Sequence, residues 1–101
     1  MNDKRYIPSP DETVLATQVW AGHEFKKYAV DVVAGPAMRP RYGRTFYAQC
    51  RNADRAIAVV KRDAFGIPAG ATFKARLASP RELGCVPTGQ HALGAHYQEV
   101  V

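Results

Sequence analysis

The stretch from Arg44 to Pro68 constrains the fold more than any other part of this chain. Its first eight residues alternate between apolar and polar side chains, as in a half-buried strand. The apolar members of this strand are Phe46, Ala48 and Cys50. Asn52 then offers a side-chain oxygen that can cap a helix, and apolar residues recur at helical spacing until Gly66. Because a glycine and a proline close the stretch, the sequence predicts a strand followed directly by one amphipathic helix that ends at Gly66.

A second alternating segment, residues 71–78, follows this helix and predicts another half-buried strand. Its polar positions are Thr72, Lys74 and Arg76. Residues 13–34 permit two interpretations. As a helix, they follow Ser-Pro-Asp-Glu, which resembles a capping box. As a hairpin, strands at 13–20 and 25–34 flank a turn, and the content of β-branched and aromatic residues together with the central Gly22 favours this interpretation.

One sheet with one helix on one face would bury both apolar sets. The sequence therefore predicts an α+β fold with two layers, in which a mainly antiparallel four-stranded sheet, possibly mixed, carries one helix on one face. Residues 1–12 are predicted to be a flexible leader, because they hold two prolines and several charges. Residues 13–84 form the single predicted domain, and residues 85–101 are a C-terminal extension whose order the sequence does not decide.

Basic residues concentrate in the middle of the chain. From Arg39 to Arg62 there are seven basic residues and only one acid, Asp54, so this segment carries +6 while the whole chain carries +5. Such a segment favours an anionic partner. A basic surface also serves solubility alone, so charge by itself does not establish binding.

The predicted sheet face opposite the helix combines a tyrosine with cations. Some nucleic-acid-binding modules stack unpaired bases on such a face while its cations attract phosphates. We expect Tyr47 to stack, and Arg51, Lys74 and Arg76 to attract phosphate. Arg39, Arg41 and Arg44, together with Tyr42, are expected to extend this surface. The full set of candidate residues for nucleic acid or another anionic partner is Arg39, Arg41, Tyr42, Arg44, Tyr47, Arg51, Lys74 and Arg76.

Residue patterns typical of catalysis or of a bound cofactor are missing from the sequence. Cys85, His91 and His96 lack the paired spacing of a structural zinc site. Cys50 lies on a predicted buried face, where a cysteine behaves as a small hydrophobe. The carboxylates form no acid–base pair, and the glycines of residues 64–71 follow a helix, whereas a phosphate-binding loop opens one. We therefore expect no metal, no cofactor and no enzymatic activity.

These observations predict a small, non-catalytic binding protein. The absence of a secretory signal and of a long apolar run predicts a cytoplasmic location without membrane contact. The leading functional hypothesis is nucleic-acid contact through the basic, tyrosine-containing strand and loop. The alternative is a protein–protein interaction module, an adaptor or inhibitor, which binds an acidic protein surface or pairs an exposed sheet edge to form a homodimer.

Overall fold

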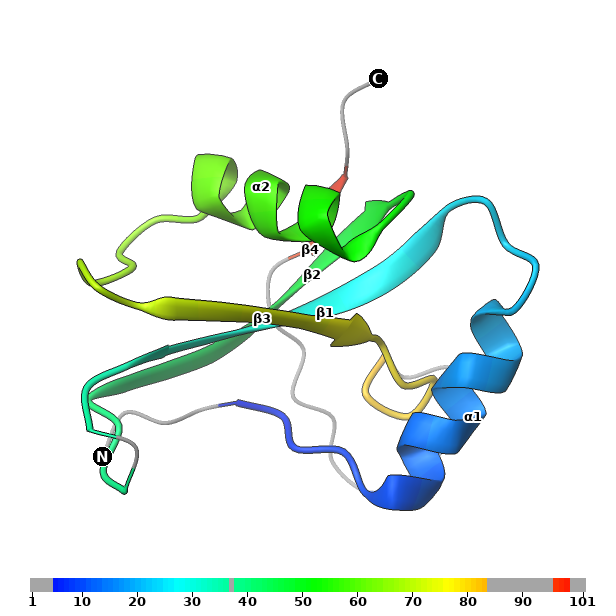
Figure 1. Cartoon of the computed structure of the whole chain (residues 1–101), viewed down its shortest axis with the longest axis horizontal. Coiled ribbons are helices and arrows are strands. Elements are labelled where there is room, and N and C mark those ends of the chain that lie inside the picture. The colour runs from blue at the N-terminus through cyan, green and yellow to red at the C-terminus, as the bar shows by residue number, and fades with distance from the viewer. Residues whose placement is uncertain (1–4, 37, 84–95, 99–101) are drawn as a thin grey trace.

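The computed structural model describes residues 5–36, 38–83 and 96–98. Within these ranges it contains the helices and strands shown in Figure 1, namely α1 (Pro10–Trp20), β1 (Lys26–Ala34), β2 (Tyr42–Cys50), α2 (Ala53–Asp63), β3 (Thr72–Leu77) and β4 (His96–Gln98). The strands lie in the order β3-β1-β2-β4. Both β2 and β3 are antiparallel to β1, and the short β4 is parallel to β2. The predicted α+β class is confirmed.

The hairpin predicted over residues 13–34 is wrong in its first half, because this part of the chain is the helix α1. Ser9 caps α1 by accepting a hydrogen bond from the backbone N–H of Glu12, and Pro10 begins the helix. Gly22 has a φ of 79° in the turn that follows Trp20. The helix therefore ends before Gly22. The free-energy cost of a glycine inside a helix, which counted against the helical interpretation, does not apply. The described chain has two helices where one was expected.

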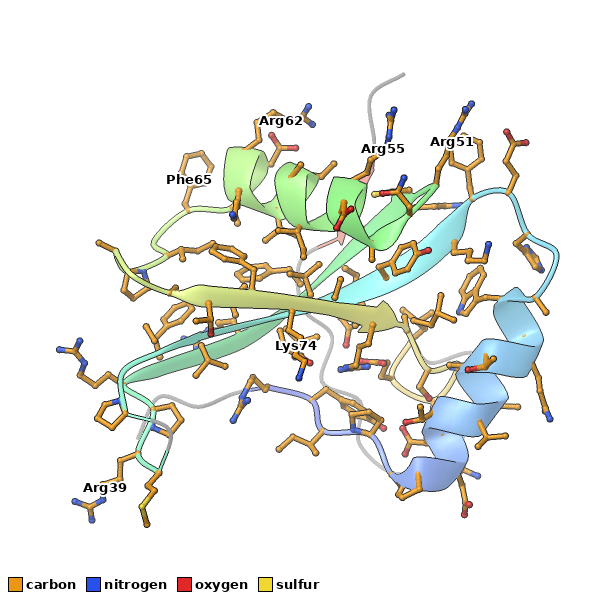
Figure 2. All side chains as sticks on the ribbon, in the orientation of Figure 1. Arg39, Arg51, Arg55, Arg62, Phe65 and Lys74 are labelled. Carbon is orange, nitrogen blue, oxygen red and sulfur yellow. The ribbon has the colours of Figure 1, made fainter. Side chains whose placement is uncertain are left out.

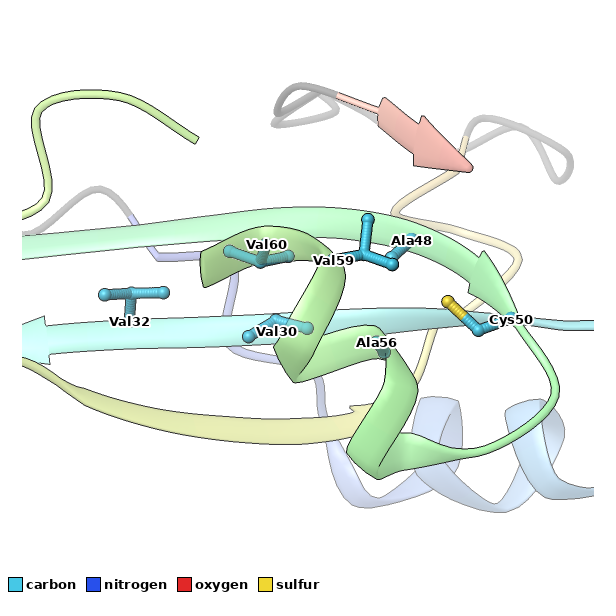
Figure 3. Packing of buried hydrophobic residues seen from close by; sticks show 7 residues of the cluster. All are labelled: Val30, Val32, Ala48, Cys50, Ala56, Val59 and Val60. Carbon is cyan, nitrogen blue, oxygen red and sulfur yellow. The ribbon is translucent and has the colours of Figure 1, made fainter. Parts of the chain in front are cut away.

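The helix α2 packs on one face of the sheet, over β1, β2 and β3. Asn52 caps it by accepting a hydrogen bond from the backbone N–H of Arg55, at 2.9 Å. The helix ends at Asp63, and Gly66 takes its positive φ in the turn beyond, so the predicted end lay slightly too far along the chain. The core between α2 and the sheet, drawn in Figure 3, consists of Val30, Val32, Ala48, Cys50, Ala56, Val59 and Val60.

Strand register agrees with the predicted alternation of faces. Val30 lies opposite both Phe46 on β2 and Ala75 on β3, so these apolar side chains share the α2 face. On the other face, Asp31 lies opposite both Thr45 and Lys74. The predicted common face of Phe46, Ala48 and Cys50 on β2 therefore agrees with the structure.

The second face of the sheet is covered as well. Figure 1 shows α1 and the chain before it on the side of the sheet opposite α2. The backbone N–H of Tyr6 donates to Thr45 Oγ1 at 3.0 Å, and the indole N–H of Trp20 donates to the carbonyl of Ala78 at 2.9 Å. The expected two-layer arrangement with one open face is therefore wrong. The predicted boundary at residue 12 falls inside α1, and residues 85–101 lie outside the described ranges except for β4.

Gly35 holds the loop between β1 and β2 in a conformation that other residues adopt poorly. Its φ is 98°, and a Cβ atom there would lie 2.8 Å from the backbone nitrogen of Arg41, which itself donates to the carbonyl of Ala34. We expect Gly35→Ala to lower the free energy of unfolding by about 2 to 3 kcal/mol, through backbone strain and this clash. Urea unfolding measures the change.

Gly66→Ala is the matched control for this substitution. Gly66 also has a positive φ, of 77°, but a Cβ atom there would have no neighbour within 4 Å. The free energy of unfolding of Gly66→Ala should therefore fall by only about 1 kcal/mol, through backbone strain alone. Equal losses at Gly35 and Gly66 would contradict the role of the close contact with Arg41.

Candidate functional site

A buried polar cluster occupies the sheet face that was expected to be open. Tyr47 has no exposed surface, and its hydroxyl donates to Glu82 Oε2 at 2.7 Å. Glu82 is fully buried too and comes from the segment that follows β3. The expectation that Tyr47 presents its ring for base stacking is therefore wrong, because this segment covers the ring.

Arg76 joins the carboxylates of this cluster. Its Nε donates to Asp31 Oδ2 at 3.0 Å, and its two terminal nitrogens donate to the two oxygens of Glu82 at 2.5 and 3.2 Å. One of these nitrogens also donates to the carbonyl of Tyr6 at 3.0 Å. The predicted place of Arg76 on an open phosphate-binding face is wrong, because its guanidinium is engaged by two acids and a backbone carbonyl.

Glu82 belongs to a sequence pattern that we did not use. Residues 79–82 read Ser-Pro-Arg-Glu, the same Ser-Pro-x-Glu spacing with which α1 begins at its N-cap Ser9. The backbone N–H of Ser79 donates to Glu82 Oε1 at 2.7 Å, the backbone N–H of Arg81 donates to Ser79 Oγ, and that of Leu83 donates to the carbonyl of Ser79. This is one helical turn closed by a capping contact. The pattern predicts the turn, but only the tertiary fold buries its carboxylate.

Ionisation in the cluster follows from burial and hydrogen bonding. Burial, followed by the hydrogen bond to Glu82, raises the pKa of Tyr47 far above its ordinary value. Burial and the hydrogen bond to Glu12 raise the pKa of Tyr6 to about 12. Burial alone would lower the pKa of Arg76, but its hydrogen bonds to Glu82 and Asp31 raise it. The tyrosines are therefore neutral and Arg76 is charged at neutral pH, as suits a structural cluster.

Alkaline pH should weaken the fold through Tyr47. A tyrosine whose pKa is raised on folding contributes stability that is complete below pH 10 and is lost as the pH rises further toward the folded pKa. Tyr47→Phe should lose about 1 kcal/mol of stability at pH 7, because one buried hydrogen bond is gone. Between pH 10 and 12 its stability should fall less steeply than that of the unmodified protein. Urea unfolding at several pH values tests this, and parallel pH curves would contradict it.

The other candidate residues are divided among three places. Arg39 and Arg41 are exposed in the loop between β1 and β2, and Lys74 is exposed on β3. Arg51 is exposed after β2, where its guanidinium lies 3.6 Å from Glu24 Oε1 and over the ring of Phe25. Figure 2 shows Arg39 and Arg51 at opposite ends of the molecule. These cations therefore do not form one continuous surface.

Tyr42 and Arg44 lie on the α2 side of the sheet. Both are half-buried, and the guanidinium carbon of Arg44 is 5.2 Å from the centre of the Tyr42 ring. In the strand register Arg44 lies opposite Val32, a member of the core beneath α2. The expectation that these two residues extend the face containing Tyr47 is wrong, because alternation directs them to the other side.

The internal cluster makes the rest of the surface more basic than the composition indicates. Asp31, Glu82 and Arg76 together carry −1, whereas the whole chain carries +5, so the remaining ionisable side chains carry +6. Two further members of this basic set, Arg55 and Arg62, project outward from α2 in Figure 2. Our candidate set did not include them.

A groove of about 320 Å³ lies beside the cluster. One wall is formed by Tyr6, Ile7 and Pro8 from the chain before α1. The opposite wall is formed by Lys74, Ala75 and Arg76 of β3, and Arg5 and Asp31 complete the lining. No pattern in the sequence predicts this groove, because it depends on where the N-terminal segment crosses the sheet.

Comparison with known proteins gives no match to a family model, to a characterised protein or to a solved structure. No helix in the described ranges is long and apolar enough to cross a membrane. Among the described residues, no three His, Cys, Asp or Glu side chains are grouped so that they could hold a metal ion. Cys85 and His91 lie outside the described ranges, as does the side chain of His96.

Proposed function

We propose that this chain is a non-catalytic binding protein for an anionic macromolecule, with the phosphate backbone of a nucleic acid as the leading partner. The observation that carries the proposal is the separation of charge between the interior and the surface. Asp31 and Glu82 turn toward Arg76, and the remaining side chains carry +6. A surface of this charge attracts polyanions before they touch it, over distances up to a Debye length.

The burial of Tyr47 changes the mode of binding that we propose. Without a stacking ring on the sheet, the contacts come from exposed arginines that attract phosphates, chiefly Arg39 and Arg41 of the β1–β2 loop and Arg55 of α2. Arg62 of α2 is exposed too, but it is paired with Asp63. Phosphate contacts carry little sequence information. Binding should therefore be strongly dependent on salt and tolerant of changes in nucleotide sequence.

Fluorescence anisotropy with labelled single- and double-stranded oligonucleotides tests this proposal. At about 50 mM salt, the double variant Arg39→Ala/Arg41→Ala should bind roughly tenfold more weakly than the unmodified protein, and its salt slope should fall by about 2, as two phosphate contacts are lost. The double variant Lys26→Ala/Arg81→Ala, which removes the same charge elsewhere, is the control. No binding at about 50 mM salt, or equal losses in both variants, would contradict the proposal.

An acidic protein is the second candidate partner. Two apolar side chains, Met38 and Phe65, are almost fully exposed, at 95% and 93%. Met38 adjoins Arg39 in its loop, and Phe65 follows the basic end of α2. Aromatic, Met and Arg side chains are enriched where proteins bind one another. Loss of partner binding in Phe65→Ser, with unchanged oligonucleotide binding, would favour this candidate.

A further inference from the structure

The strand β3 lies at the edge of the sheet, and its outer backbone groups point away from the other strands. The backbone N–H of Ala78 donates to the carbonyl of Lys27, so Lys27 and Ala78 are a hydrogen-bonded pair of the antiparallel β1–β3 ladder. Because hydrogen-bonded pairs alternate along such a ladder, the backbone groups of Lys74 and Arg76 bond to β1. The N–H and C=O groups of Phe73 and Ala75 therefore point outward. Within the described ranges, no strand pairs with this edge.

The groove follows this free edge. Its lining includes Ala75 together with Lys74 and Arg76, so it opens beside the outward backbone groups. A smaller hollow of about 100 Å³ continues along the same strand toward Leu77 and Ser79. Both hollows share Pro8 and Arg76, and their opposite wall comes from the N-terminal segment and then from α1. The shape is therefore a trough parallel to β3.

Side chains of the trough combine apolar and cationic surface. Ile7 is 76% exposed on one wall, and Pro8 adds further apolar atoms. Lys74 is exposed on the opposite wall, and Arg5 is half-buried at the same site. Two acids also line the trough, but Asp31 is engaged by Arg76, and Glu12 accepts a hydrogen bond from the hydroxyl of Tyr6. Charge complementarity thus selects an occupant that carries carboxylates.

We propose that the trough beside β3 binds an extended acidic segment of a partner protein, which adds to the sheet as a further strand next to β3. An extended backbone can satisfy the outward groups of Phe73 and Ala75 at strand spacing, whereas a compact anion cannot reach both. A carboxylate on the groove side of that segment meets Lys74. This site is separate from the phosphate-contacting arginines, and the inference does not depend on nucleic-acid binding.

A second copy of this chain fits the edge poorly. Antiparallel pairing of two β3 strands centred on Ala75 places Lys74 opposite Arg76 of the other copy. Pairing centred on Lys74 or on Arg76 places that residue opposite its own equivalent. Like charges directly opposite one another destabilise strand pairs, and lysine on an edge strand is a known defence against self-association. These registers are thus disfavoured for self-association, whereas an acidic strand would place carboxylates opposite the cations.

Two substitutions isolate the features of this site. Ala75→Pro removes an outward N–H and leaves the bonds of β3 to β1 in place, as proline permits only on an edge strand. Lys74→Glu reverses the charge of the groove wall. Arg55→Glu, on α2, is the control for the same charge change. Thermal unfolding of each variant verifies that its fold is retained.

The experiment selects binders from a phage-displayed library of random octapeptides against the full chain, then measures the most enriched peptide, fluorescein-labelled, by anisotropy. The expected result is an acidic peptide whose affinity falls at least tenfold in Ala75→Pro and in Lys74→Glu but less than twofold in Arg55→Glu. Amide NMR shifts on binding should centre on Phe73 and Ala75.

Three results would overturn the inference. The first is that no peptide is enriched. The second is a selected peptide that Ala75→Pro binds as well as the unmodified protein does. The third is a dimer in analytical ultracentrifugation that Ala75→Pro dissociates, because the edge would then belong to a second copy. Oligonucleotide affinity in Ala75→Pro distinguishes this site from the proposed function, since it should not change.

Discussion

Replacing Arg76 by alanine is expected to lower the free energy of unfolding by about 3 to 5 kcal/mol, the range found when one partner of a buried ion pair is removed. The guanidinium is 23% exposed and pairs with Asp31 and with the fully buried Glu82. Its loss leaves two carboxylates close to one another without their cation. Because a domain of this size has a total stability of only about 5 to 15 kcal/mol, this substitution removes a large share of it.

Chemical denaturation of Arg76→Ala measures this loss, with Lys74→Ala as the control on the same strand. Lys74 is exposed, so its substitution should change the stability by less than about 0.5 kcal/mol. A loss below about 1 kcal/mol at pH 7 would show that the cluster does not hold this face of the sheet together.

The second large effect is expected from Glu82→Ala, at about 3 kcal/mol. This substitution leaves the hydroxyl of Tyr47 and the backbone N–H of Ser79 without their acceptor, and each buried donor left unsatisfied costs about 1 to 3 kcal/mol. Arg76 keeps its pairing with Asp31, so the charge that remains is balanced. The expected loss is therefore smaller than that for Arg76→Ala.

A double-mutant cycle measures the interaction free energy between Arg76 and Glu82 apart from their other contacts. The variant Arg76→Ala/Glu82→Ala should be more stable than the sum of the two single losses implies, by about 1 to 3 kcal/mol, because both single losses include the broken contact between Arg76 and Glu82. The same denaturation series provides all four free energies. Strict additivity would show that Arg76 and Glu82 act independently, in spite of their direct contact.

Local patterns in the sequence predicted the elements that depend on neighbouring residues. The cap at Asn52, the apolar stripe of α2 and the alternation of β2 and β3 all appear in the structure. The helix α1 was missed because propensity was weighed over the whole of residues 13–34. The capping signal at Ser9 and the turn at Gly22 divide that stretch into a helix and a strand.

Whether the candidate residues are buried or exposed depends on tertiary contacts that no local sequence pattern contains. Alternation placed Tyr47, Lys74 and Arg76 correctly on one face of the sheet, but whether that face met water depended on chain segments far away in sequence. Glu82 lies 35 residues from Tyr47, from whose hydroxyl it accepts a hydrogen bond, and Tyr6 lies 70 residues from Arg76, whose guanidinium it contacts. The candidate cations are therefore divided between Arg76 in the cluster and the arginines and lysine at the surface.

The division of the candidate residues into a buried cluster and surface cations is the central claim, and one comparison tests it directly. Oligonucleotide affinity and stability are measured together for Tyr47→Phe and for Arg39→Ala/Arg41→Ala. We predict that Tyr47→Phe loses about 1 kcal/mol of stability but binds oligonucleotide as the unmodified protein does. The arginine variant should keep its stability and bind roughly tenfold more weakly at low salt. Weakened binding in Tyr47→Phe with an intact fold, and none in the arginine variant, would contradict the account.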